Sequence, residues 1–268
     1  MKKIYFLVLV IFVGCGGAAG LWFPIPPLPY VEEEEYVVRE TPVIRYYNNY
    51  EPISGIETIV PEVPQRRAMV ALTFDDGPST HTSSILDLLE EYNARATFFL
   101  LGDRVRSRPN TVRRIYALGN EIGNHSWSHT RFTEITFDEI VRELEMTGTA
   151  ISELVDYQPI LARPPFGSTN QVVKDAFAEA GYAVIMWSLD TLDWKYRDSD
   201  WIYNIIMDEV RDGSIILLHD LHAQTAVAME RVIPSLIEAD FDLVTVSELL
   251  AYFYGELVPG KIYDRIDE

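Results

Sequence analysis

Short apolar runs alternate with longer amphipathic stretches along the chain from Ala68 onward. The short runs are typical of buried strands, whereas the longer stretches repeat their apolar residues at helical spacing. The predicted strands are 69–72, 96–101, 121–123, 160–162, 183–187, 214–218 and 242–244. The predicted helices are 85–92, 109–118, 137–155, 171–180, 201–210, 225–239 and 247–254. Strands that alternate with helices in this way indicate parallel βαβ units, so the predicted fold class is α/β.

Polar side chains follow five of the predicted strands, at the point where each strand ends. They are Asp75 and Asp76, His125 and His129, Arg163, Asp190 and Asp193, and His219 and Asp220. In a (β/α) barrel the carboxyl ends of the strands converge on one face, and such enzymes build their active sites there. The pattern therefore predicts a (β/α) barrel with parallel strands and an active site at the C-terminal strand ends.

Two of these polar groups have the composition of a metal site. His125 and His129 are four residues apart, and Asp75 and Asp76 are adjacent. Two neutral imidazoles and one carboxylate leave a divalent metal with open positions for water and substrate, as in a catalytic rather than a structural site. The sequence thus predicts a catalytic metal with one carboxylate to spare.

Composition and charge indicate which classes of partner the protein is not expected to bind. The chain has 268 residues, 48% of them hydrophobic, which is enough for one large domain and its core. It carries 41 acidic against 22 basic residues and no lysine or arginine cluster. Because such a surface repels nucleic acid and anionic membranes, a nucleic-acid partner is not expected. Nothing in the sequence implies a protein partner.

The first 20 residues have the three parts of a secretory signal peptide: a basic start, an apolar run and a stretch of small residues. Phe12-Val13-Gly14-Cys15 resembles a bacterial lipoprotein box, in which the cysteine is lipidated. The alternative is cleavage after Ala19 or Gly20 and free secretion. Either route exports the protein, and a lipid on Cys15 is the only membrane contact expected. Cys15 is the only cysteine, so no intrachain disulfide is possible.

The composition changes between residues 21 and 67, where prolines and glutamates are dense. Proline at this density stiffens a chain and prevents regular ladders, which indicates a surface spacer. The alternative is that this stretch adds a strand to the main domain. We therefore expect a signal segment over 1–20, a spacer over 21–67, a catalytic domain over 68–254 and a C-terminal tail over 255–268.

Five short motifs, in order over roughly residues 68–252, resemble those of the polysaccharide deacetylases of the NodB-homology type, carbohydrate esterase family 4. The motifs are Thr73-Phe74-Asp75-Asp76-Gly77-Pro78, His125-Ser126-Trp127-Ser128-His129, Arg163-Pro164-Pro165-Phe166-Gly167, Asp190-Thr191-Leu192-Asp193-Trp194 and Leu217-Leu218-His219-Asp220. The resemblance implies a distorted (β/α) barrel, in agreement with the alternation of strands and helices. It also implies an enzyme that removes acetyl groups from a polysaccharide.

The resemblance implies roles for the metal side of the site. Asp76, His125 and His129 are implied as ligands of a divalent metal, with Zn²⁺ as the first choice and Co²⁺ as the alternative. Asp75 is implied as the base that takes a proton from the attacking water. Arg163 is implied as the partner that holds the Asp75 carboxylate and keeps it ionised. The alternative for Arg163 is a surface ion pair.

It also implies roles on the leaving-group side. His219 is implied as the acid that protonates the leaving amine, with Asp193 as the carboxylate that raises the pKa of His219. The backbone N–H of Phe166 matches the oxyanion donor of the family. The family usually carries tyrosine there, so a contact from its hydroxyl is lost. Trp194 and Leu217 match residues that line the pocket for the acetyl methyl group, and the alternative for both is core packing.

Four further polar residues are placed outside the predicted site. Asp190 and Asp220 are expected to orient loops or to accept backbone hydrogen bonds at strand ends. His81 is expected at a helix start and His222 in a loop after the fifth motif, both in solvated or capping roles.

The resemblance leaves several substrates open. The family acts on N-acetylglucosamine of peptidoglycan, on chitin or chitooligosaccharides, and in some members on acetylated xylan. An exported bacterial protein lies beside peptidoglycan, and the Asp75-Asp76 pair disfavours the subgroup that acts on N-acetylmuramic acid. The sequence thus predicts a peptidoglycan N-acetylglucosamine deacetylase in the cell envelope, whose only implied partner is the acetylated glycan. The alternatives are a chitooligosaccharide deacetylase, an acetyl-xylan O-esterase and, outside enzymes, a glycan-binding surface lipoprotein.

Overall fold

The computed structural model describes residues 66–264. The predicted signal segment, Cys15 and nearly all of the predicted spacer lie outside the described residues, as do residues 265–268. Within the described range, no helix combines the length and the apolar character that crossing a membrane requires.

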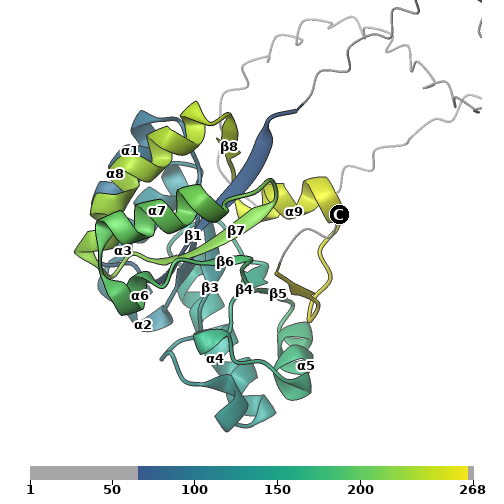
Figure 1. Ribbon diagram of the computed structural model, residues 1–268. Coiled ribbons are helices and arrows are strands. Elements are labelled where there is room, and N and C mark those ends of the chain that lie inside the picture. The colour runs from purple at the N-terminus through teal and green to yellow at the C-terminus, as the bar shows by residue number, and fades with distance from the viewer. Residues whose placement is uncertain (1–65, 265–268) are drawn as a thin grey trace, which may run out of the picture. The chain divides into compact units, whose positions relative to one another are not determined.

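Within residues 66–264, nine strands form a single sheet in which every pairing is parallel (Figure 1). The strands are β1 (Ala68–Gly77), β2 (Thr97–Leu100), β3 (Glu121–Asn124), β4 (Leu161–Ala162), β5 (Ala183–Ile185), β6 (Leu189–Asp190), β7 (Ser214–His219), β8 (Phe241–Leu243) and β9 (Ile262–Tyr263). Their order is β6-β7-β1-β2-β3-β4-β5-β9, and β8 pairs with the start of β1. No pairing joins the edge strands β6 and β9 within residues 66–264. The predicted distorted (β/α) barrel is thus confirmed, with one side open.

Helices follow most of the strands. They are α1 (Thr82–Glu91), α2 (Gly102–Ser107), α3 (Pro109–Ala117), α4 (Phe137–Ser152), α5 (Gln171–Glu179), α6 (Asp193–Tyr196), α7 (Ser199–Glu209), α8 (Ala223–Glu238) and α9 (Val246–Tyr254). Each of the seven predicted helices is present. Helices α4 and α9 begin with capping boxes, Thr136 with Glu139 and Thr245 with Glu248, which satisfy the first free N–H groups and fix where these helices start.

The side chains of β1 show why the candidate site lies on one face of the sheet. Val70, Leu72 and Phe74 point into the larger apolar core, which also contains residues of α1, α3, α7 and α8. Ala71 belongs to a second core with residues of α9. Figure 1 shows α9 on the other side of β1 from α1, α7 and α8. Because side chains alternate along a strand, Asp75 lies on the same face as Ala71, inside the barrel.

The strand register brings the predicted site residues to one end of the sheet. Asp75 on β1 lies opposite His219 on β7. Strands β3 and β4 end in register, so the residues that follow them, His125 and Arg163, lie side by side. This end is the C-terminal end of the strands, as the sequence pattern predicts.

The structure departs from the predicted domain limits at both ends. Strand β9 lies in the segment 255–268 that was assigned to a tail, and it pairs with β5 at the edge of the sheet. A two-residue strand is too short to produce a hydrophobic period, so its role shows only in three dimensions. At the other limit, Arg66 and Arg67 of the predicted spacer form ion pairs with Asp212 and Asp240.

Candidate active site

A cavity of about 440 Å³ opens where the strands end. Its wall consists of Asp75, Asp76, His125, His129, Phe166, Gly167, Trp187, Asp190, Trp194, Leu217, His219 and His222. Eight of the ten predicted site residues of the folded domain are in this wall. The other two, Arg163 and Asp193, are fully buried, and each contacts a residue of the wall. The structure therefore brings the whole predicted set together.

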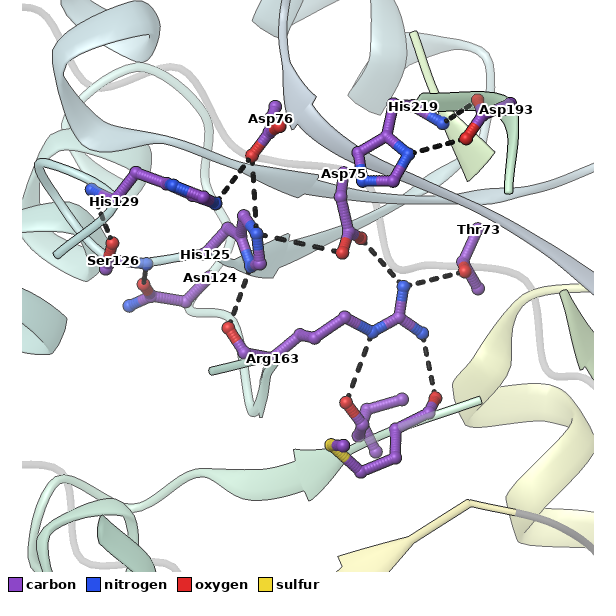
Figure 2. A network of polar contacts seen from close by, with 12 residues as sticks. Thr73, Asp75, Asp76, Asn124, His125, Ser126, His129, Arg163, Asp193 and His219 are labelled. Atoms are coloured by element: carbon purple, nitrogen blue, oxygen red, sulfur yellow. Dashed lines mark hydrogen bonds and ion pairs between the residues drawn. The ribbon is translucent and has the colours of Figure 1, made fainter. Parts of the chain in front are cut away.

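Three side chains meet on one side of the cavity (Figure 2). Asp76 Oδ1 lies 3.4 Å from His125 Nε2 and 3.2 Å from His129 Nε2. Asp76 Oδ1 is buried and has no hydrogen-bond partner among the described residues. Among these residues, Asp76, His125 and His129 form the one cluster whose ligand atoms are close enough to hold a metal ion. A buried, unpartnered carboxylate oxygen that faces two imidazole nitrogens fits a divalent cation.

The orientation of His125 is fixed from behind. Its Nδ1 lies 2.8 Å from the carbonyl oxygen of Arg163. Because a carbonyl only accepts, Nδ1 carries a proton and Nε2 is the nitrogen that faces Asp76. Burial lowers the pKa of His125, but the charges of Asp75 and Asp76 raise it by more. Because a ligating imidazole is neutral, a metal at this position competes with a proton for His125.

Four non-glycine residues of the site have left-handed backbone angles. The φ values are 70° for Asp76, 73° for Ser126, 61° for His129 and 61° for Phe166. Such conformations cost on the order of 1–3 kcal/mol each and persist where the surrounding contacts impose them. One such contact is visible in Figure 2, where the Ser126 hydroxyl accepts the N–H of His129 at 3.0 Å. The backbone of the site is thus held under strain.

Asp75 is the spare carboxylate, and Arg163 holds it. Asp75 Oδ1 accepts Arg163 Nη1 at 2.7 Å, and both side chains are buried. The Arg163 guanidinium also donates to Thr73 Oγ1 and to the carbonyls of Ile185 and Met186, at 2.8, 3.2 and 2.9 Å. Burial lowers the pKa of Arg163, and the charge of Asp75 opposes this shift. With Oδ1 occupied, Asp75 has its second oxygen available on the cavity side, 3.7 Å from His125 Nε2.

His219 lies on the other side of Asp75 and has its own carboxylate partner. Its Nδ1 lies 2.7 Å from Asp193 Oδ1. Asp193 also accepts the backbone N–H groups of His219 and Trp194 and the hydroxyl of Thr225, at 2.7, 2.8 and 2.7 Å. Burial lowers the pKa of His219, but the hydrogen bond and the charge of Asp193 raise it by more, to about 9. The metal-free protein therefore has a protonated His219 at neutral pH, and Nε2 is the nitrogen not used by Asp193.

The apolar part of the wall is formed by residues from three motifs. Phe166 is 55% exposed, and its ring lies 4.5 Å from that of His129 and 4.3 Å from the guanidinium of Arg131. Trp194 is half exposed, whereas Leu217 is buried with one face on the cavity. The Phe166 ring thus contacts one histidine of the Asp76-His125-His129 cluster and one arginine.

Two polar residues that the sequence placed outside the predicted site lie in the wall. Asp190 accepts the N–H of Leu192 at 2.9 Å with its Oδ1, the backbone hydrogen bond at a strand end that the sequence predicted, and it also lines the cavity. His222 is expected in a solvated or capping role; it stands at the N-cap position of α8 without a side-chain capping bond, it lines the cavity, and burial lowers its pKa. The only signal for His222 was its position three residues after His219.

Two other polar residues stay outside the cavity, as expected. Asp220 is fully buried, accepts the Thr82 hydroxyl, and has its pKa raised to about 7 by burial. His81 precedes α1 at its N-cap position and makes no side-chain capping bond. His81 is therefore a histidine of the same domain that does not line the site.

Comparison with known proteins gives consistent relatives. A family model described as polysaccharide deacetylase matches residues 62–185. The peptidoglycan-N-acetylglucosamine deacetylase PgdA of Listeria monocytogenes is 38% identical over 213 residues, 78% of this chain and 44% of the relative. The peptidoglycan-N-acetylmuramic acid deacetylase PdaC of Bacillus subtilis is 39% identical over 188 residues, 70% of this chain and 40% of the relative. The chain thus spans less than half the length of these two relatives.

A shorter relative and a solved structure are each matched over nearly their whole length. A peptidoglycan-N-acetylglucosamine deacetylase of Bacillus cereus is 39% identical over 197 residues, 71% of this chain and 92% of the relative. A family 4 acetyl xylan esterase from Clostridium thermocellum, solved with a cobalt ion, matches with a TM-score of 0.70 and 32% identity. That match covers 75% of this chain and 100% of the esterase chain. The likeness therefore extends from the sequence to the fold.

Proposed function

The chain belongs to the polysaccharide deacetylase family, and from this membership and the cavity we propose that it removes N-acetyl groups from N-acetylglucosamine residues of peptidoglycan. The products are acetate and a free amine on the glycan. The observation that carries the proposal is the division of the cavity. Asp76, His125 and His129 lie on one side, His219 lies on another, and Asp75 lies between them.

We assign the metal to the three clustered side chains. Asp76, His125 and His129 would hold a divalent ion, for which Zn²⁺ is the first choice because two imidazoles and one carboxylate suit it. The cobalt ion in the Clostridium esterase supports Co²⁺ as the alternative. When bound, such an ion polarises the acetyl carbonyl and lowers the pKa of water.

The protein's own groups act on the metal side as follows. Asp75 accepts a proton from the water that attacks the acetyl carbon, using the oxygen that Arg163 does not hold. Arg163 keeps the carboxylate in one orientation through its four hydrogen bonds. The backbone N–H of Phe166 donates to the oxyanion of the tetrahedral intermediate. The base is thus positioned before substrate binds.

The leaving-group side completes the reaction. An amine leaves poorly until its nitrogen is protonated, so the broken C–N bond needs an acid beside it. His219 donates that proton, and Asp193 keeps it on the imidazole at neutral pH. Trp194 and Leu217 surround the acetyl methyl group.

The substrate and the location are proposed from the relatives. Two of the relatives are named for peptidoglycan N-acetylglucosamine. Peptidoglycan lies outside the cytoplasm, so we propose a place in the cell envelope, with Cys15 as a lipid anchor. Cys15 lies outside the described residues. Labelling with a palmitate analogue that persists in Cys15→Ser would rule out that anchor.

Acetate release tests the function directly. The protein, loaded with zinc or cobalt, is incubated with peptidoglycan, chitooligosaccharides and acetylated xylan, and free acetate is measured. We expect release from peptidoglycan and a lower rate on the other two. The likeness to the xylan esterase supports an O-esterase as the second candidate, and faster release from xylan would favour it. Glycan binding without acetate release, with metal bound, would contradict the enzyme and leave a binding protein.

A pH profile tests the acid. Because His219 acts in its protonated form, we expect deacetylation to fall on the alkaline side. The pKa of His219 is about 9 without a metal, and a bound cation offsets the nearby carboxylates, so the fall should come below that value. In Asp193→Asn the charge that raises the pKa of His219 is gone, so the alkaline limb should move toward about 6.5. The measurement is kcat against pH for both proteins. An unchanged limb would exclude His219 as the titrating acid.

A further inference from the structure

We propose that Glu143, on helix α4 and outside all five motifs, is a positioning residue that holds the loop carrying two metal ligands and thereby sets the affinity for the metal. The inference rests on the metal site of the proposed function. It adds a residue that no motif contains, at a place where the chain has to be kept in an unfavourable conformation.

The loop from His125 to His129 depends on external support. Ser126 and His129 both have left-handed backbone angles, which non-glycine residues rarely adopt. The two ligands lie at the two ends of this short loop. If the loop relaxes toward ordinary backbone angles, His129 moves relative to His125 and Asp76. The geometry of the cluster therefore depends on whatever holds the middle of the loop.

Glu143 holds that middle. Its Oε2 accepts the backbone N–H groups of Trp127 and Ser128, each at 2.9 Å. The Ser128 hydroxyl also donates to the same carboxylate, at 3.0 Å to Oε1 and 3.1 Å to Oε2. Hydrogen bonds to an ionised acceptor are stronger than neutral ones. One carboxylate thus fixes two successive peptide units between the ligands.

The opposite side of the loop is held by the start of α2. The N–H groups of Gly102 and Asp103 donate to the carbonyls of Ser126 and Trp127, at 3.0 and 3.3 Å. The Trp127 ring packs so closely on Gly102 that a Cβ there would lie 2.3 Å from it. The carbonyls of the loop therefore accept hydrogen bonds from α2, and its N–H groups donate hydrogen bonds to Glu143.

Glu143 itself lies on a rigid element. Helix α4 begins with the capping box of Thr136 and Glu139. Ile140 and Leu144, on either side of Glu143 in the sequence, are buried in the apolar core formed with α5. The carboxylate is thus supplied by a capped and packed helix, which can impose a conformation on a strained loop.

Zinc affinity provides the test. The full chain is titrated with zinc against a chromophoric chelator, as wild type, Glu143→Ala and Glu143→Gln. We expect Glu143→Ala to bind zinc about 10- to 100-fold more weakly, as for other residues that orient metal ligands. Glu143→Gln should lose less, because its amide oxygen still accepts an N–H. The matched control is Glu145→Ala, an exposed glutamate of the same helix, which should bind zinc like the wild type.

Two further readouts separate positioning from general stability. The melting temperature of metal-free Glu143→Gln should match that of the wild type, and saturating zinc should restore most of the kcat of Glu143→Ala. Wild-type zinc affinity in both Glu143 variants would overturn the inference and leave the proposed function intact. A metal-free Glu143→Gln protein that melts early in proportion to its lost affinity would also overturn it, in favour of a structural role. A wild-type protein that binds no zinc would remove the proposed metal site as well.

Discussion

Asp75→Asn is expected to keep the bound metal and to lose about 10²- to 10⁴-fold in kcat, the usual contribution of a general base. Asparagine has nearly the shape of aspartate, and its amide oxygen can still accept a hydrogen bond from Arg163. The cluster of Asp76, His125 and His129 should therefore stay in place. It cannot take a proton from water. Metal content by elemental analysis and acetate release on the same preparation are the two measurements.

The paired variant is His125→Ala, which removes one of the three proposed ligands and should lose both metal and turnover. Two matched controls come from the same domain. His81→Ala removes a histidine that does not line the cavity, and Asp190→Asn removes another carboxylate of its wall. Both should keep the metal and most of the activity. If Asp75→Asn turned over substrate like the wild type, Asp75 would not be the base, and if Asp190→Asn lost as much, the cavity's total charge would explain the effect.

The sequence predicts the fold well where elements are long and periodic. Helix α4 lies close to its predicted range because it buries one face. Strand β7 does so because nearly all of its side chains are buried. Helix α2, strand β6 and strand β9 were not predicted. They have six, two and two residues, which is too few for a period to emerge. Their place in the domain is decided by the elements that they pack against.

The candidate site also has one part that the sequence predicts and another that it does not. Residues whose proposed roles depend on side chains in the motifs, such as Asp76 and His219, can be predicted from the sequence. Of the four acceptors that fix Arg163, Thr73 and Asp75 belong to the first motif, but the other two are the backbone carbonyls of Ile185 and Met186, and every residue has a carbonyl. Glu143 is equally invisible, since it reaches the histidine loop from a separate helix. Tertiary placement, and not residue type, gives these groups their roles.

Arg163→Met is expected to destabilise the protein strongly as well as to abolish turnover. The guanidinium is fully buried, and its loss leaves the Asp75 carboxylate buried without its charge partner. Breaking such a pair from one side costs about 3–5 kcal/mol. For a chain of this size that is a fall in melting temperature on the order of 10 °C. The measurements are urea unfolding and thermal melting of the metal-free protein.

A double-mutant cycle distinguishes the charge from the packing. The variant that combines Asp75→Asn with Arg163→Met leaves no unpaired charge, so it should be more stable than Arg163→Met alone. If the cost came only from the lost contacts with Phe99 and with the two carbonyls, the second substitution would bring no recovery. Arg163→Lys keeps the charge but cannot serve all four acceptors, so its stability should fall between wild type and Arg163→Met. Recovery in the double variant would therefore show that the unpaired charge of Asp75, and not the lost packing, is what destabilises Arg163→Met.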